Sequence, residues 1–150
     1  MIKELRVGNY VAYKGKPSLV CALDYDPKLR KENISVVYKW GEPPYKTNGD
    51  IQPILLTEKL VLQCGFNQLD DYTFDNDEME ITQDWDDQTV YYITTHANEY
   101  TVSGHRIEYL HQLQNAYFCL SGGKELAYII HSGFISGYQN RYGDNLKPPT

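Results

Sequence analysis

The longest helical pattern in the chain lies between residues 106 and 121. Apolar side chains recur there at three- and four-residue spacing, which places them on one face of a helix. They are Ile107, Leu110, Leu113, Tyr117 and Leu120. Gly122 follows, where helices often end in a left-handed residue. The pattern predicts a helix over about 106–121, against which strands from elsewhere can pack.

A shorter pattern predicts a helix over 57–65. Thr57 can cap its first turn, and Leu56 and Val61 stand at the two positions of a hydrophobic staple. Gly65 follows its last turn. Because two turns are not stable alone, this helix is expected to dock on a sheet.

Strand patterns dominate the first 55 residues. Strand-like runs with β-branched and aromatic residues lie at 5–13, 18–24 and 34–40. A polar loop is expected over 26–33, and 50–55 is expected at a sheet edge because Pro53 cannot donate to a ladder. Short strands with tight turns predict a small bent sheet or SH3-like barrel over 1–55.

Residues 56–150 are expected to form a second half. Strand patterns over about 72–102 predict an antiparallel meander, across which the helix at about 106–121 would pack. Residues 131–150 have no periodicity and predict an irregular tail. The predicted fold class is therefore α+β, with an SH3-like first half, a short linking helix and a helix-packed meander.

Charge is distributed unevenly along the chain, whose net charge is −6. Residues 60–105 carry ten Asp and Glu and no Lys or Arg, whereas residues 1–59 carry ten Lys and Arg against seven acids. The acidic segment argues against nucleic acid binding there, because phosphates would be repelled.

The apolar runs, the N-terminus and the cysteines indicate the cellular compartment. No apolar run approaches the roughly 18 residues that a membrane span needs, and the N-terminus lacks the apolar core of a signal peptide. The three cysteines are far apart and form no CxxC pair, which favours reduced thiols. A cytoplasmic protein without a membrane partner is expected.

Three stretches resemble a family of small uncharacterised proteins from gut Bacteroides-type bacteria and their phages or mobile elements. They are Leu5-Arg6-Val7-Gly8-Asn9-Tyr10-Val11, residues 55–66, and Glu108-Tyr109-Leu110-His111-Gln112-Leu113-Gln114-Asn115-Ala116-Tyr117-Phe118 with Ser121-Gly122. The resemblance covers about residues 3–126, and the third stretch is its most specific part. It implies no established activity, so no residue role is carried over. The sequence departs from the family pattern in a longer ending at 121–126 and in an extension over 127–150.

Candidate chemistry is sparse. Glu108 and His111 have a spacing that suits two ligands of one metal, but a closed shell needs more ligands than the pattern supplies. Cys119 lies among apolar residues and Cys64 ends a helix, so neither has the setting of an activated thiolate. No nucleophile elbow, zinc-protease motif or phosphate-binding loop is present. No catalytic residue, metal site or cofactor is expected.

Two groups of residues remain as candidates for interaction. The first is the polar side of the predicted helix, where amides could face a partner or cap the sheet; its residues are His111, Gln112, Gln114 and Asn115. The second is the acidic hairpin region, which solubility alone could explain; its residues are Asp77, Glu80, Asp84, Trp85 and Asp87.

Three functional hypotheses follow. The first is a non-enzymatic accessory protein of phage or mobile-element type that binds another protein. The second is an acidic inhibitor that mimics nucleic acid phosphates and occupies a basic site on a host protein. The third is an enzyme whose site forms only in three dimensions. Self-association is left open by the sequence.

Overall fold

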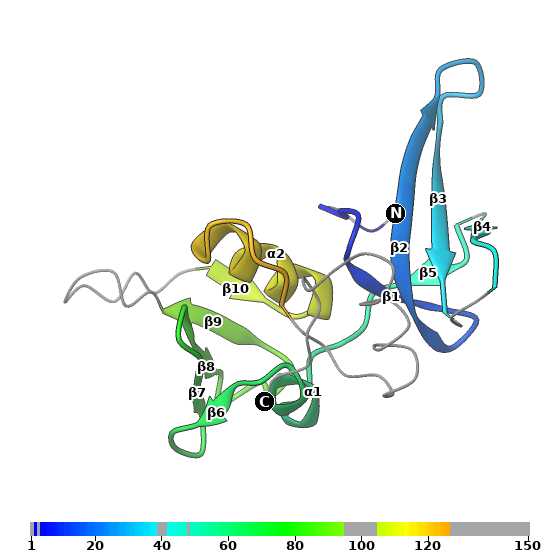
Figure 1. Ribbon diagram of the computed structural model, residues 1–150. Helices are drawn as coiled ribbons and strands as arrows, with labels where there is room; N and C mark the ends of the chain where they lie inside the picture. Colours follow the sequence, from blue (N-terminus) through cyan, green and yellow to red (C-terminus); the bar gives the residue numbers. More distant parts are fainter. Residues whose placement is uncertain (1, 3, 39–41, 48, 95–104, 127–150) are drawn as a thin grey trace.

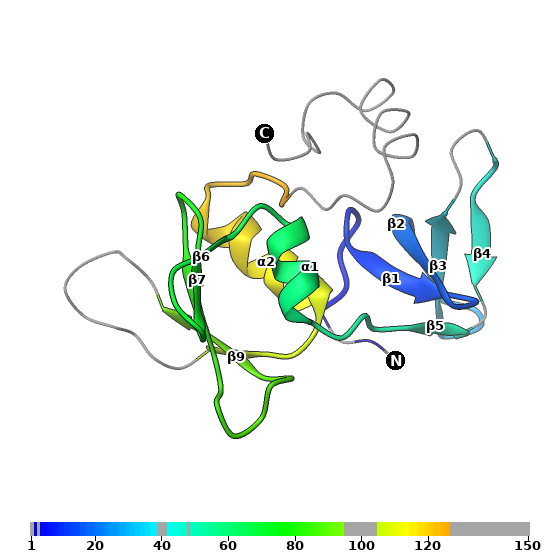
Figure 2. The same cartoon turned by 90° about the horizontal axis from the view of Figure 1, so that it is seen from below.

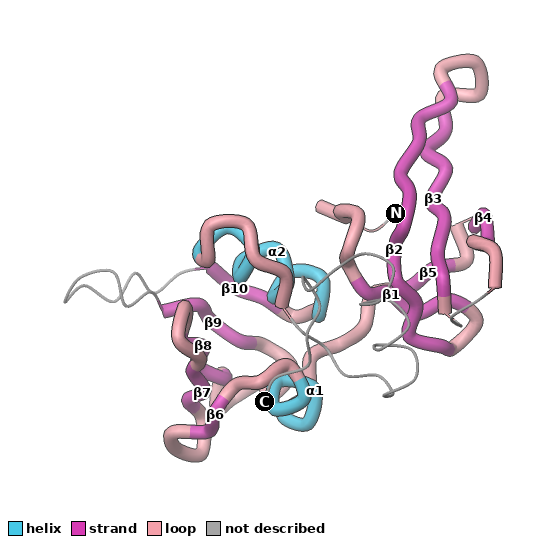
Figure 3. The backbone as a smooth tube through the Cα atoms, in the orientation of Figure 1, coloured by secondary structure: helices cyan, strands magenta, loops and turns pink. Residues whose placement is uncertain are grey.

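The computed structural model describes residues 2, 4–38, 42–47, 49–94 and 105–126. This part of the chain is mostly β-structure, with two five-stranded antiparallel sheets and two helices. Figures 1 and 2 place both helices between the two sheets. Figure 3 shows the same arrangement with helices, strands and loops distinguished by colour.

The first sheet is curled into a half-barrel with the strand order β4-β3-β2-β1-β5. Its strands are β1 (Tyr10–Tyr13), β2 (Lys16–Asp26), β3 (Lys31–Val37), β4 (Tyr45–Thr47) and β5 (Ile51–Gln52). The register shifts between Val20 and Ala22, a β-bulge that bends the strand. β5 is an edge strand that ends just before Pro53, in agreement with the edge position predicted from that proline.

The predicted polar loop over 26–33 is wrong for half of its length. β2 and β3 stay paired out to Asp26 and Lys31 and form a ribbon that projects from the molecule (Figure 1). Only residues 27–30 form the turn. Polar residues suit this ribbon because it is exposed on both faces near its tip, so hydrophobic patterning gives no strand signal there.

The second sheet is a meander with the order β10-β9-β8-β7-β6. Its strands are β6 (Asn67–Gln68), β7 (Thr73–Asp75), β8 (Glu80–Gln83), β9 (Tyr91–Thr94) and β10 (His105–Ile107). The strands expected near 72–94 are present, whereas the expected strand at 98–102 lies outside the described residues. Phe74, Ile81 and Ile93 align across three strands and face the core.

The short helix α1 (Glu58–Gln63) begins and ends at the predicted capping residues. The Thr57 hydroxyl accepts a hydrogen bond from the Leu60 amide at 3.1 Å. Leu56 and Val61 are both buried in the main core, and Gly65 takes a φ of 86°. The helix therefore docks as its staple residues predict.

The predicted helix at 106–121 begins later than expected. α2 covers Leu110–Leu120, and the residues before it are extended and form β10. The Leu56 amide donates to the Glu108 carbonyl at 2.9 Å, and the Leu110 amide donates to the Ile54 carbonyl at 2.8 Å. These bonds between distant segments compete with a first helical turn, which is why the helical spacing of Ile107 is misleading.

Two apolar cores organise the described part of the chain. The smaller fills the half-barrel and includes Val11, Val20 and Val36. The larger lies between the second sheet and the helices, and Tyr10 and Leu19 of the first sheet belong to it. The two sheets therefore share a buried core through β1 and β2. The tail predicted for 131–150 lies outside the described residues.

Candidate functional site

The amide side of α2 is bound to the N-terminal segment of the same chain. The Gln114 side chain is completely buried and makes two hydrogen bonds to backbone groups. Its Oε1 accepts from the Tyr10 amide at 2.8 Å, and its Nε2 donates to the Gly8 carbonyl at 3.0 Å. A glutamine satisfies both groups because it carries a donor and an acceptor on one planar amide.

Asn115 extends this contact. Its Oδ1 accepts from Asn9 Nδ2 at 2.9 Å and from Arg6 Nε at 3.1 Å. The Arg6 guanidinium also forms a bidentate ion pair with Glu125 and lies 4.2 Å from the centre of the Phe118 ring. We call this set, together with Gln114, the amide clamp. It joins the N-terminal segment before β1 to α2.

Gly8 is required by the amide clamp. Its φ is 97°, a conformation that side chains disfavour. A β-carbon there would also lie 3.1 Å from Glu125 Oε1 and 3.3 Å from an Arg6 nitrogen. The glycine therefore allows the N-terminal segment to approach the clamp closely.

His111 and Gln112 have a different position from Gln114 and Asn115. Gln112 Oε1 accepts from the backbone amides of Glu108 and Tyr109, at 2.8 and 3.1 Å, and so stabilises the start of α2. His111 is buried, and its ring stacks on Tyr109 with 5.9 Å between ring centres. Both side chains line a pocket between α2 and the half-barrel.

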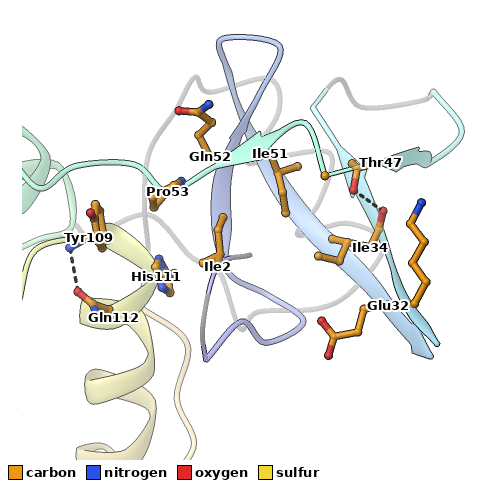
Figure 4. Close-up of a pocket in the computed structure, with 12 residues that line it drawn as sticks. Ile2, Glu32, Ile34, Thr47, Ile51, Gln52, Pro53, Tyr109, His111 and Gln112 are labelled. Atoms are coloured by element: carbon orange, nitrogen blue, oxygen red, sulfur yellow. Dashed lines mark hydrogen bonds between the residues drawn. The ribbon is translucent and has the colours of Figure 1, made fainter. Parts of the chain in front are cut away.

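This junction pocket has a volume of about 680 Å³ and is shown in Figure 4. Residues from the start of α2 form one wall, and strands β3, β4 and β5 form the other. Its lining is Ile2, Lys31, Glu32, Ile34, Thr47, Gly49, Ile51, Gln52, Pro53, Tyr109, His111 and Gln112. The volume suits a small ligand or a few residues of peptide.

The junction pocket is apolar at its centre and polar at its rim. Ile2, Ile34 and Ile51 also pack at the open side of the half-barrel core. Lys31 and Glu32 are exposed at the rim. Such a lining suits an apolar group held by a few polar contacts.

The ionisable side chains that line the junction pocket lie apart. Figure 4 places His111 and Glu32 on opposite sides of the junction pocket, with Ile2 between them. No cysteine lines this pocket. Among residues 2, 4–38, 42–47, 49–94 and 105–126, no three His, Cys, Asp or Glu residues are grouped in a way that could hold a metal ion.

The cysteines differ in burial, which predicts an order of chemical labelling. Burial raises the pKa of the Cys64 thiol to about 12 and also raises the pKa of Cys21. Cys119 is exposed. We expect N-ethylmaleimide at pH 7 to label Cys119 first and Cys64 only after unfolding, as read by peptide mass spectrometry. Labelling of Cys64 in the folded protein at the rate of Cys119 would contradict this order.

The acidic candidates are spread along the second sheet. Asp77 lies in the turn before β8, whereas Asp84 and Asp87 lie in the turn after it, at the opposite end of that strand. Glu80 pairs with Asp75 and Thr94, so it lies on the sheet face away from the core. The structure therefore does not gather these carboxylates at one end of the sheet.

Several aspartates near this sheet hold turns together. Asp84 Oδ1 accepts from the amides of Asp86 and Asp87 at 2.8 and 3.3 Å. Asp87 Oδ1 accepts from the amide and the hydroxyl of Thr89 at 3.0 and 2.7 Å. Hydrogen bonds from Thr89 lower the pKa of Asp87, because they favour the ionised carboxylate.

Trp85, at the tip of the β8–β9 turn, is 78% exposed. It meets Tyr72 edge to face, with 6.5 Å between ring centres, beside a hollow of about 380 Å³. Tyr72 was not among the predicted site residues. In the sequence, Tyr72 follows two aspartates and precedes a strand, which is the one local feature that could have marked it. Its contact with Trp85 depends on the turns before β7 and after β8, whose geometry the sequence does not show.

Most of the junction pocket was also missed from the sequence. Ile34 and Ile51 lie in segments predicted to be extended, and Ile2 lies in the N-terminal segment, for which no site is predicted. Nothing local marks them, because the pocket forms only where the half-barrel meets α2.

Comparison of the chain with known protein families, with curated proteins and with solved structures finds no match in any of the three. Within the part of the chain that the structure describes, neither helix has the length and apolar character that a membrane crossing needs.

Proposed function

We propose that this is a non-enzymatic accessory protein that binds an extended segment of another protein in the junction pocket. The observation that carries the proposal is the position of this pocket between the two edges of the curled sheet. Thr47 of β4 and Ile51 of β5 both line it, and β4 and β5 are the terminal strands of their sheet. Sheet edges present backbone groups that an added strand can pair with.

The lining supports an apolar anchor on that segment. Ile2, Ile34 and Ile51 offer a place for an aliphatic or aromatic side chain, and burial of one such side chain is worth about 1.5–3 kcal/mol. Lys31 and Glu32 at the rim can pair with charges of either sign. We propose further that the half-barrel is SH3-like, an architecture that often binds peptides.

Peptide selection against the immobilised full chain tests the proposal. Random nine-residue peptides displayed on phage are expected to yield a consensus with apolar residues at alternate positions. Gln52→Trp, which places a large side chain at the exposed rim of the junction pocket, is expected to weaken binding of the selected peptide at least tenfold. The affinity is measured by isothermal titration calorimetry.

Gln68→Trp is the matched control, because Gln68 is exposed on the edge strand β6 of the other sheet. It is expected to leave peptide binding within twofold of the unaltered chain. Selection without a consensus, or a selected peptide that binds the Gln52→Trp variant unchanged, would overturn the proposal.

An acidic inhibitor that competes with nucleic acid is the second candidate function. Its support is that residues 60–105 carry ten Asp and Glu and no Lys or Arg. The test is competition with fluorescent duplex DNA for a panel of basic DNA-binding proteins. Displacement by the full chain, reduced when Asp77, Asp84 and Asp87 become Asn, is expected; no displacement from any of them would reject the inhibitor.

A further inference from the structure

The second sheet carries an exposed pair of aromatic rings with no role in the core. Trp85 is 78% exposed and Tyr72 is 42% exposed, and their rings stand at 65° to each other. They form two walls of the hollow described above, which is also lined by Thr73 and Thr82, paired between β7 and β8. We call this site the aromatic corner.

Both walls of the aromatic corner are held by aspartate side chains. Asp70 Oδ1 accepts from the amides of Tyr72 and Thr73 at 2.9 and 2.8 Å, which fixes the turn that carries Tyr72. Asp84 Oδ1 fixes the turn that carries Trp85 through two backbone bonds. A site whose walls are already fixed loses less conformational entropy when it binds.

The same site is electrically negative. Asp70 and Asp71 line the hollow, and the faces of aromatic rings attract cations. Hydrogen bonds from Tyr72 and Thr73 lower the pKa of the Asp70 carboxyl, which is ionised at neutral pH as exposed aspartates are. The segment 60–105 contains no Lys or Arg. Arg106 lies on β10, where it aligns with Thr82 across β9, and its guanidinium is paired with Glu108.

We propose that the aromatic corner binds a lysine side chain on a basic segment of a partner protein. The aliphatic stem would lie against Trp85 and Tyr72, and the ammonium group would face Asp70 and Asp71. Lysine suits the site because its long apolar stem and terminal charge match an apolar wall beside carboxylates. This site is on the second sheet, and its use does not depend on the junction pocket.

A hexalysine peptide and the isotopically labelled full chain provide the test. The indole N–H signal of Trp85, one of two tryptophans in the chain, is assigned from the spectrum of the Trp85→Phe variant. Hexalysine is expected to shift this signal and the Tyr72 amide, whereas hexaglutamate is not. Trp85→Ala is expected to weaken hexalysine binding at least tenfold, and Trp85→Phe, which keeps an aromatic face, less than fourfold.

Tyr25→Ala is the matched control, because Tyr25 is 61% exposed on the β2–β3 ribbon of the other sheet. It and Gln52→Trp are expected to leave hexalysine binding within twofold, while Asp71→Asn weakens it several-fold. The proposal fails if hexalysine shifts signals over the whole acidic surface but spares Trp85. It also fails if Trp85→Ala binds as tightly as the unaltered chain.

Discussion

Replacement of Gln114 by leucine is expected to lower the free energy of unfolding by roughly 2–4 kcal/mol, because it removes the hydrogen bonds that the glutamine side chain makes to two buried backbone groups. The Tyr10 amide and the Gly8 carbonyl both bond to the Gln114 side chain, which is completely buried. Leucine has nearly the same volume, so the change removes hydrogen bonds with little change in packing. Urea unfolding followed by far-ultraviolet circular dichroism measures the effect.

Gln88→Leu is the matched control, since Gln88 is exposed in the turn before β9. We expect its effect to stay within about 0.5 kcal/mol, as is usual for surface substitutions. If the two leucine variants were equally stable, the two hydrogen bonds of Gln114 would contribute nothing measurable to the joining of α2 and the N-terminal segment.

The fold was predictable where local chemistry and packing agree. Thr57 and Gly65 mark the two ends of α1, and Leu56 and Val61 mark its buried side, by their spacing alone. The start of α2 was not predictable in this way, because Ile107 satisfies a helical spacing although it lies in β10. Long-range bonds of residues 108–110 with residues 54–56 decide between the two, and no local pattern contains them.

The candidate site was predictable only in part. The polar side of α2 was recognised as unusual, and the structure divides it into clamp residues and pocket residues. Gln114 contacts Gly8 and Tyr10, and His111 faces the half-barrel across the junction pocket. This division depends on how α2 packs against the first sheet, which cannot be predicted from the spacing of residues in the sequence.

The two halves are joined by side chains as well as by hydrogen bonds, and Leu19→Ala tests how strongly. Leu19 is completely buried and belongs to the core that contains Leu110 and Leu113, although it lies on β2 of the half-barrel. Truncation of a buried leucine to alanine costs about 2–5 kcal/mol. Because the lost contacts cross between the sheets, we expect both sheets to unfold together at a lower urea concentration.

Amide signals from β3 and from β8, followed in urea by nuclear magnetic resonance, distinguish the alternatives. If the β3 and β8 signals change at the same urea concentration, both in the unaltered chain and in Leu19→Ala, the two sheets unfold as one cooperative unit. Leu23→Ala is the control, because Leu23 lies on the same strand with its side chain 38% exposed, and it should have a much smaller effect. The prediction is contradicted if Leu19→Ala lowers the urea midpoint of the β3 signals and leaves that of the β8 signals unchanged. The shared core would then not couple the two halves, and the junction pocket would lie between parts that can separate.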